Sequence, residues 1–147
     1  MPRYFPSKSI KAVTGYYKEH FFDFIDYIKL MPDVKKTLGG LKNKGLKLAI
    51  ATNTYKKQAE GILKKLGLYK FFDAIVGADE VKKGKPSPDM ILKALKGLKL
   101  KMNEIYFIGD TAIDVKTCKN ANCKIIGFKI KGDKRIDNLN GLLRLVQ

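Results

Sequence analysis

The chain has 147 residues, a length that suits one folded domain of about 100–200 residues better than two with separate cores. Apolar residues make up 45% of the chain and aromatic residues 10%, which can fill one core and excludes a disordered chain. No apolar run approaches the ~20 residues of a membrane-spanning helix, and the first residues lack the apolar run of a secretory signal. We therefore expect a cytoplasmic protein with no membrane partner.

The charge is strongly positive, because 30 lysines and arginines stand against 14 acidic residues. Nearly all of the basic residues are lysines, and they are scattered along the chain in ones and twos. Proteins that read nucleic-acid bases use arginine forks, whereas lysine acts as a solvated point charge. The pattern makes nucleic acid an improbable partner and suits the attraction of a small anionic substrate.

The two cysteines, Cys118 and Cys123, are five positions apart, and the single histidine, His20, is distant in the sequence. This spacing fits neither a disulfide framework nor a zinc site. We expect both cysteines to be buried free thiols.

Apolar spacing predicts a helix over residues 9–30, which ends at the run Met31-Pro32-Asp33. Helices and strands then alternate. The predicted helices cover residues 34–44, 56–66, 87–97, 113–121 and 139–146, and the predicted strands cover residues 46–52, 74–77, 104–108 and 124–129. Such alternation favours the α/β class, with a Rossmann-like parallel sheet flanked by helices. Ligands of these sheets bind at the carboxyl ends of the strands.

Polar side chains follow three consecutive predicted strands. Thr52 and Asn53 come after the first strand, Lys85 lies in the loop after the second, and Asp110 and Asp114 come after the third. A hydroxyl, an amide, a lysine and two carboxylates are the groups that a magnesium-assisted phosphoryl site needs. Taken singly, each has an ordinary structural interpretation: a cap at a strand end, a surface lysine, or carboxylates at a helix start. Their coincidence at three strand ends favours a common site.

Three segments carrying these residues resemble the second, third and fourth motifs of the haloacid dehalogenase superfamily. The segments are residues 48–54, 82–89 and 105–114, and their order and spacing also fit. The similarity runs from about residue 31 to the end of the chain and is greatest to the phosphoglycolate-phosphatase-like branch. It implies a Mg²⁺-dependent phosphomonoester hydrolase that acts on a small phosphorylated metabolite.

The resemblance also implies a role for each residue. Thr52 and the backbone of Asn53 would hold the phosphate, and Lys85 would stabilise the phosphate and the nucleophile, so that Thr52 and Lys85 are the catalytic candidates. Asp110 and Asp114 would anchor Mg²⁺ as the metal ligands.

One family motif is missing from the sequence. Family members begin with a strand that ends in Asp-x-Asp-Gly-Thr, whose first aspartate attacks phosphorus and whose second is the general acid and base. No two aspartates of this chain are two positions apart. In the family this strand is central, between the strands that end here at Thr52 and Gly109. Those two strands either pair directly, or another segment, a second copy or a partner chain fills the space.

The resemblance divides the chain into a helical lead, residues 1–30, and an α/β core, residues 31–147. The lead looks like the last helix of the small helical cap of this branch, without the rest of the cap. Its aromatic side chains would then lack their usual partners, so we expect a homo-oligomer. The aromatic residues concerned are Tyr16, Tyr17, Phe21 and Phe24.

Two hypotheses about function follow. The chain is either the larger, C-terminal part of a truncated or split phosphatase, inactive alone because it lacks the nucleophile, or a non-catalytic module that binds phosphate and metal or acts as a scaffold. A peptide carrying Asp-x-Asp-Gly-Thr would restore turnover only to the first.

Overall fold

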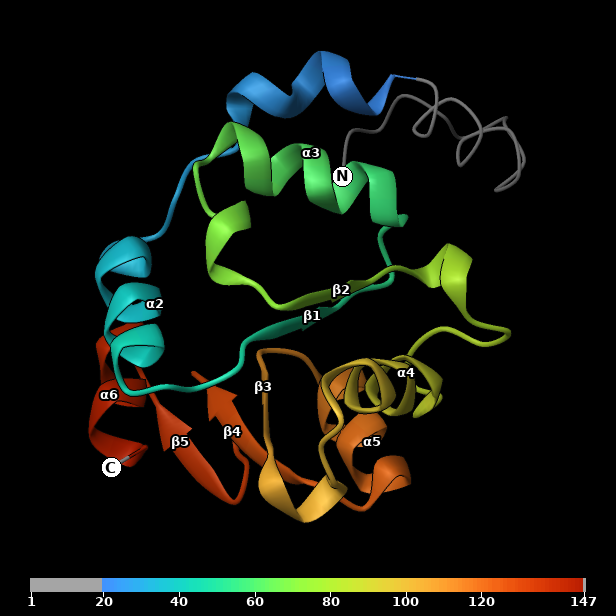
Figure 1. Ribbon diagram of the computed structural model, residues 1–147, viewed down its shortest axis with the longest axis vertical. Helices are drawn as coiled ribbons and strands as arrows, with labels where there is room; N and C mark the ends of the chain where they lie inside the picture. The colour runs from blue at the N-terminus through green and yellow to red at the C-terminus, as the bar shows by residue number, and fades with distance from the viewer. Residues whose placement is uncertain (1–19, 147) are drawn as a thin grey trace.

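The computed structural model describes residues 20–146, and its elements follow the predicted alternation (Figure 1). The α-helices are α2 (Val34–Asn43), α3 (Lys56–Lys65), α4 (Asp89–Leu98), α5 (Ala112–Ala121) and α6 (Leu142–Leu145). The strands are β1 (Ala49–Ala51), β2 (Ala74–Val76), β3 (Tyr106–Gly109), β4 (Lys124–Phe128) and β5 (Lys134–Ile136). All strand pairs are parallel, which confirms the predicted α/β class.

The strands form two separate sheets rather than one. β1 pairs with β2 in one sheet, with Ala51 opposite Val76, and the other sheet has the order β3-β4-β5, with Gly109 opposite Gly127. β1 and β3 do not pair with each other. Within residues 20–146, direct pairing of these two strands is therefore excluded, and each has one edge without a neighbouring strand.

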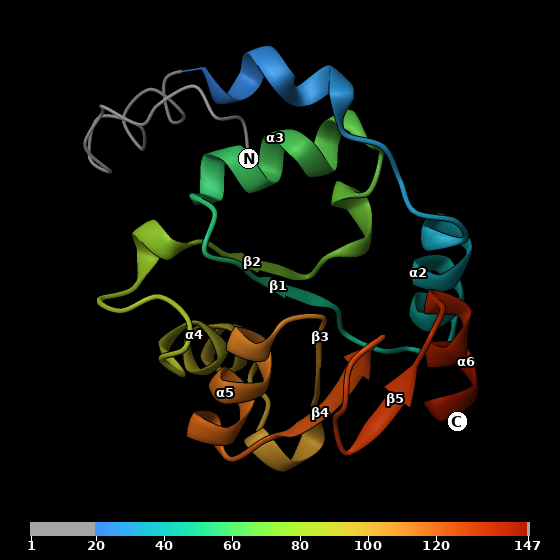
Figure 2. The same ribbon diagram turned by 180° about the vertical axis from the view of Figure 1, so that it is seen from behind.

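Each sheet has its own apolar core. Val76 of β2 packs with Met90 and Ala94 of α4. The second core joins α2 and α6 to the other sheet, and its buried members are Leu41, Ile126, Ile136 and Leu142. Figure 1 and Figure 2 show α3 on one side of the β1–β2 sheet and α4 on the other. Helices therefore flank the sheet on both faces, as predicted.

Strand β5 was not predicted. Of its three residues, Lys134 and Arg135 are exposed and only Ile136 is buried. A segment of this kind has no apolar alternation from which a strand could be recognised, and it follows Gly132 and Asp133, which are typical of turns.

The helical lead differs from its prediction where the structure describes it. Residues 9–19, with Tyr16 and Tyr17, lie outside the described part of the chain. Phe21–Tyr27 form a short 3-10 helix, η1, instead of α-helix, and no side chain caps its start. η1 lies along α3, where Asp26 pairs with Lys65. Phe21 is buried, whereas Phe24 is 52% exposed.

The expectation of two free thiols is wrong in the structure, which pairs Cys118 with Cys123 as a disulfide. Disulfide frameworks usually tie distant segments of a chain together. Here the bond spans only the turn between α5 and β4.

Candidate active site

Thr52 lies directly after β1, at the carboxyl end of its sheet. Its backbone N–H donates to the carbonyl oxygen of Val76 at 3.0 Å, and its hydroxyl accepts a hydrogen bond from the Thr54 N–H at 3.1 Å. These bonds fix Thr52 at the point where the chain leaves the strand for α3. Thr52 as a whole is half-buried and stands at the strand end, the position that the sequence predicted.

Asn53 is bound to the loop that carries Lys85. The Lys85 N–H donates to Asn53 Oδ1 at 2.8 Å, and Asn53 Nδ2 donates back to the Lys85 carbonyl oxygen at 3.3 Å. The close approach depends on Gly84, because a Cβ atom there would lie 2.8 Å from Asn53 Oδ1. The side-chain amide of Asn53 thus binds both the backbone N–H and the backbone carbonyl oxygen of Lys85.

Lys85 and Asp114 form a buried ion pair. Lys85 Nζ lies 2.6 Å from Asp114 Oδ1, and the two side chains are only 16% and 6% exposed. Lys85 follows β2, whereas Asp114 lies in the first turn of α5, after β3. The pair therefore joins the carboxyl ends of the two separate sheets.

The second oxygen of Asp114 is engaged by the start of α5. Asp114 Oδ2 accepts hydrogen bonds from the N–H groups of Asp110 and Thr111, each at 3.2 Å, and from the Thr111 hydroxyl at 2.7 Å. The Asp114 N–H donates in return to the Thr111 hydroxyl oxygen at 3.2 Å, which completes a capping box. Both carboxylate oxygens of Asp114 therefore have donors.

Burial and hydrogen bonding act in opposite directions on Asp114. Burial raises the pKa of its carboxyl, but the hydrogen bonds from Lys85 and Thr111 lower it by more, so the pKa lies below its ordinary value. The carboxylate is thus charged at neutral pH, although its side chain is nearly inaccessible to water.

Gly109, the last residue of β3, allows Asp114 to approach the strand. A Cβ atom at this position would lie 2.3 Å from Asp114 Cβ and 2.9 Å from Asp114 Cγ. Distances this short require one of the two residues to move, so glycine is needed here for close packing.

Asp110 differs from Asp114 in being exposed, and no hydrogen bond or ion pair to its carboxylate is found among residues 20–146. Mg²⁺ binds proteins through one or two carboxylates and keeps waters or phosphate oxygens as its other ligands. Asp110 fits such a ligand. Asp114 would bind a metal directly only by exchanging one of its present donors for the ion.

The structure brings together four of the five predicted residues. Asn53 contacts Lys85, Lys85 contacts Asp114, and Asp114 contacts the backbone of Asp110. Thr52 lies beside Asn53 in the chain, and the described hydrogen bonds do not link its hydroxyl to the other four.

Two further residues, Thr111 and Asn120, hold this arrangement. Thr111 caps α5, and the spacing Thr-x-x-Asp is a capping signal that the sequence contains. Asn120 Nδ2 donates to the Pro86 carbonyl oxygen at 2.9 Å, and no sequence signal marks that contact.

No group of three or more His, Cys, Asp or Glu side chains in residues 20–146 is placed to hold a metal ion. A metal at Asp110 would therefore need oxygen ligands from a substrate, from water or from residues outside the described part. Among residues 20–146, no helix has the length and apolarity that a bilayer crossing requires.

Most of the chain is similar in sequence to known hydrolases. The family model described as haloacid dehalogenase-like hydrolase matches residues 2–128. Pyrophosphatase PpaX of Halalkalibacterium halodurans is 33% identical over 130 residues, which are 87% of this chain and 60% of the relative. Phosphoglycolate phosphatase of Aquifex aeolicus is 36% identical over 109 residues, which are 74% of this chain and 51% of the relative.

Solved structures share the fold. The structure of CbbY from Rhodobacter sphaeroides in complex with phosphate superposes with a TM-score of 0.78 at 22% identity, covering 92% of this chain and 67% of that one. A subfamily IA hydrolase from Geobacter sulfurreducens gives a TM-score of 0.80 at 16% identity, covering 97% and 74%. The chain spans 50% to 60% of the length of two pyrophosphatases and of the Aquifex aeolicus phosphatase, and 39% of the phosphoglycolate phosphatase of Escherichia coli.

Proposed function

Because this chain belongs to the haloacid dehalogenase-like hydrolase family, we propose that it forms the phosphate-binding and metal-binding part of a phosphomonoester hydrolase. The attacking aspartate would come from outside these 147 residues, because the sequence contains no Asp-x-Asp. The main support is the buried Lys85–Asp114 pair, which holds a cation at the carboxyl ends of β2 and β3, where Asp114 also binds the backbone N–H of Asp110.

Each residue has a role that its position supports. The Thr52 hydroxyl and the Asn53 N–H would donate to phosphate oxygens, and Lys85 would place positive charge where negative charge develops during transfer. Asn53 and Asp114 keep the Lys85 backbone and ammonium in place. Enzymes of this family typically depend on Mg²⁺, which Asp110 would hold and which would supply further positive charge at the phosphate.

The space between β1 and β3 is where we place the missing strand. Both strands have an unpaired edge, and Ile108 of β3 is 44% exposed, which is unusual in a parallel sheet covered by helices. An inserted strand would pair with both edges and carry its aspartate to the carboxyl end, next to Lys85. That aspartate would attack phosphorus in line, and water would then cleave the aspartyl-phosphate.

The strand would come from another part of a longer polypeptide or from a different chain. A second copy of this chain could fill the space, but it could not supply Asp-x-Asp. Homo-oligomer formation remains a prediction that is separate from catalysis.

A non-catalytic phosphate- and metal-binding module is the second candidate. It is favoured by the missing nucleophile and by the Lys85–Asp114 pair, which is complete without any further residue. Such a module would bind inorganic phosphate and Mg²⁺ without turnover.

Hydrolysis of p-nitrophenyl phosphate with Mg²⁺ tests both candidates. The purified chain is assayed alone and with a synthetic peptide that ends in Asp-x-Asp-Gly-Thr, and a peptide with Asn in place of the first Asp is the control. Turnover with the Asp peptide only, lost again in the Asp110→Asn chain, would support the hydrolase. Binding of phosphate and Mg²⁺ by calorimetry without turnover would support the module. Absence of both binding and turnover would contradict both proposals.

A further inference from the structure

Cys118 and Cys123 lie on either side of the turn that joins α5 to β4. Asn122 ends the helix in the left-handed conformation, with φ 55°, and directs the chain back so that Cys123 precedes the strand. The two Cα atoms are 5.2 Å apart, which lies within the range of about 4.4–6.8 Å that a disulfide spans. The backbone thus accommodates the bond without moving.

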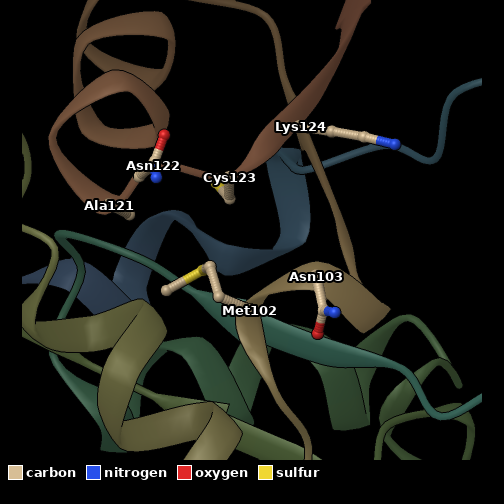
Figure 3. A pocket seen from close by; sticks show the side chains of 6 residues that line it. All are labelled: Met102, Asn103, Ala121, Asn122, Cys123 and Lys124. Atoms are coloured by element: carbon tan, nitrogen blue, oxygen red, sulfur yellow. The ribbon is translucent and has the colours of Figure 1, made fainter.

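The two cysteine residues differ in their exposure to solvent. Cys118 is 1% exposed, whereas Cys123 is half-buried and lines an open hollow of about 390 Å³. Figure 3 shows Cys123 beside Met102 in this hollow, with Asn103 and Lys124 at its border. A small molecule can therefore reach Cys123 but not Cys118.

The reduced form also fits this backbone. Cys118 Sγ lies 2.8 Å from the carbonyl oxygen of Cys123, which can accept a hydrogen bond from the Cys118 thiol. The buried sulfur has a partner in both forms: the carbonyl oxygen when reduced and the Cys123 sulfur when oxidised. Conversion between the forms requires no unfolding of α5 or β4.

We propose that Cys118 and Cys123 form a reversible thiol–disulfide site that reacts with small disulfides through Cys123. The Cys123 thiolate attacks one sulfur of the small disulfide, which forms a mixed disulfide and releases the first small thiol. The Cys118 thiolate then attacks the Cys123 sulfur and releases the second. The protein loses two electrons and two protons, and the small disulfide is reduced to two thiols.

This site is independent of the proposed function. The hollow lies at the amino ends of β3 and β4, whereas the candidate active site lies at the carboxyl ends of the strands. Failure of either proposal therefore leaves the other untouched.

Intact-mass spectrometry of the fully reduced chain exposed to glutathione disulfide tests the proposal. We expect the wild-type chain to lose the mass of two hydrogen atoms, to keep no glutathione, and to regain that mass with dithiothreitol. The Cys118→Ala variant should retain one glutathione on Cys123, because no second thiol can displace it. The Cys123→Ala variant should stay unmodified, because Cys118 is buried.

Two results would overturn the proposal. One is a wild-type chain that does not change in mass or that keeps glutathione; this measurement requires no substitution and no assumption about the folding of a variant. The other is reaction of Cys123→Ala at a rate equal to that of Cys118→Ala, which would show that access does not distinguish the two sulfurs.

Discussion

The two sheets contribute opposite charges to the candidate site. The β1–β2 half supplies the hydroxyl of Thr52, the amide of Asn53 and the ammonium of Lys85, whereas the β3–β4–β5 half supplies the carboxylates of Asp110 and Asp114. No backbone ladder joins β1 to β3. At this end of the molecule, the two halves meet instead through the Lys85–Asp114 pair and the bond from Asn120 to Pro86.

Polar contacts therefore hold the carboxyl ends of the sheets together in place of a strand. Each half has an apolar core that forms without the site, one around Met90 and one around Ile126. The site residues thus serve two purposes, since the groups proposed to bind phosphate also join the halves. Substitutions at the junction should change stability more than matched substitutions inside one half.

Replacement of Lys85 by Ala should have the largest effect. It leaves the buried Asp114 carboxylate without its cation, and breaking a buried pair in this way costs about 3–5 kcal/mol. Urea unfolding followed by circular dichroism measures the loss. The matched control is Asp137→Asn, which removes the exposed pair with Arg135 inside one half and should change stability little. Equal losses of unfolding free energy in the two variants would show that the pair at the junction stabilises the chain no more than an exposed pair inside one half.

Gly109→Ala should have the next largest effect. The added Cβ would lie 2.3 Å from Asp114 Cβ, and overpacking of this kind costs about 1–3 kcal/mol. Gly97 of α4 is the control, because a Cβ there meets nothing within 4 Å. Alanine at this helical position should stabilise the chain by up to about 1 kcal/mol. Opposite signs in the two unfolding experiments are expected, and a shared sign would contradict the close approach at Gly109.

The pH dependence of stability should reveal Asp114 directly. Its pKa is lower in the folded chain, because hydrogen bonds from Lys85 and Thr111 outweigh burial, so the unfolded chain binds more protons in mild acid. The stabilisation is therefore present at neutral pH and is lost progressively as the pH falls below about 5.

The Asp114→Asn variant should show a shallower fall in unfolding free energy over this range. Asp73 and Glu80 also have lowered pKa values, but they titrate in both chains, so the difference between the two slopes belongs to Asp114. Parallel curves for the two chains would contradict the assignment.

The sequence predicted most of the fold because its signals are local. Periodic apolar residues and turn residues marked the helices from α2 onward and the first four strands. β5 was missed because two of its three residues are exposed. Its pairing with β4 is a tertiary contact that no local pattern in the sequence records.

The candidate site was predicted as a set of residues but not as a network. The strand ends identified Lys85 and Asp114. Their ion pair, however, depends on how the two halves lie relative to each other, and the spacing of residues along the chain does not determine that placement. The same holds for Asn53, which was expected to bind phosphate through its backbone and whose side chain holds the Lys85 loop. The cysteine pair was missed because a bond across one turn does not resemble a framework of distant cysteines.

Asp110→Asn should have the smallest effect on folding, and it separates the two proposed purposes of the site. Asp110 is exposed, so its substitution should change the free energy of unfolding by no more than about 0.5 kcal/mol. Mg²⁺ affinity, measured by calorimetry, should nevertheless fall, because a neutral amide is a weaker ligand for this cation than a carboxylate. Asp137→Asn again serves as the control and should leave Mg²⁺ affinity unchanged. An Asp110→Asn chain that binds Mg²⁺ as tightly as the wild type would place the metal elsewhere and leave the junction of the two halves with a structural purpose alone.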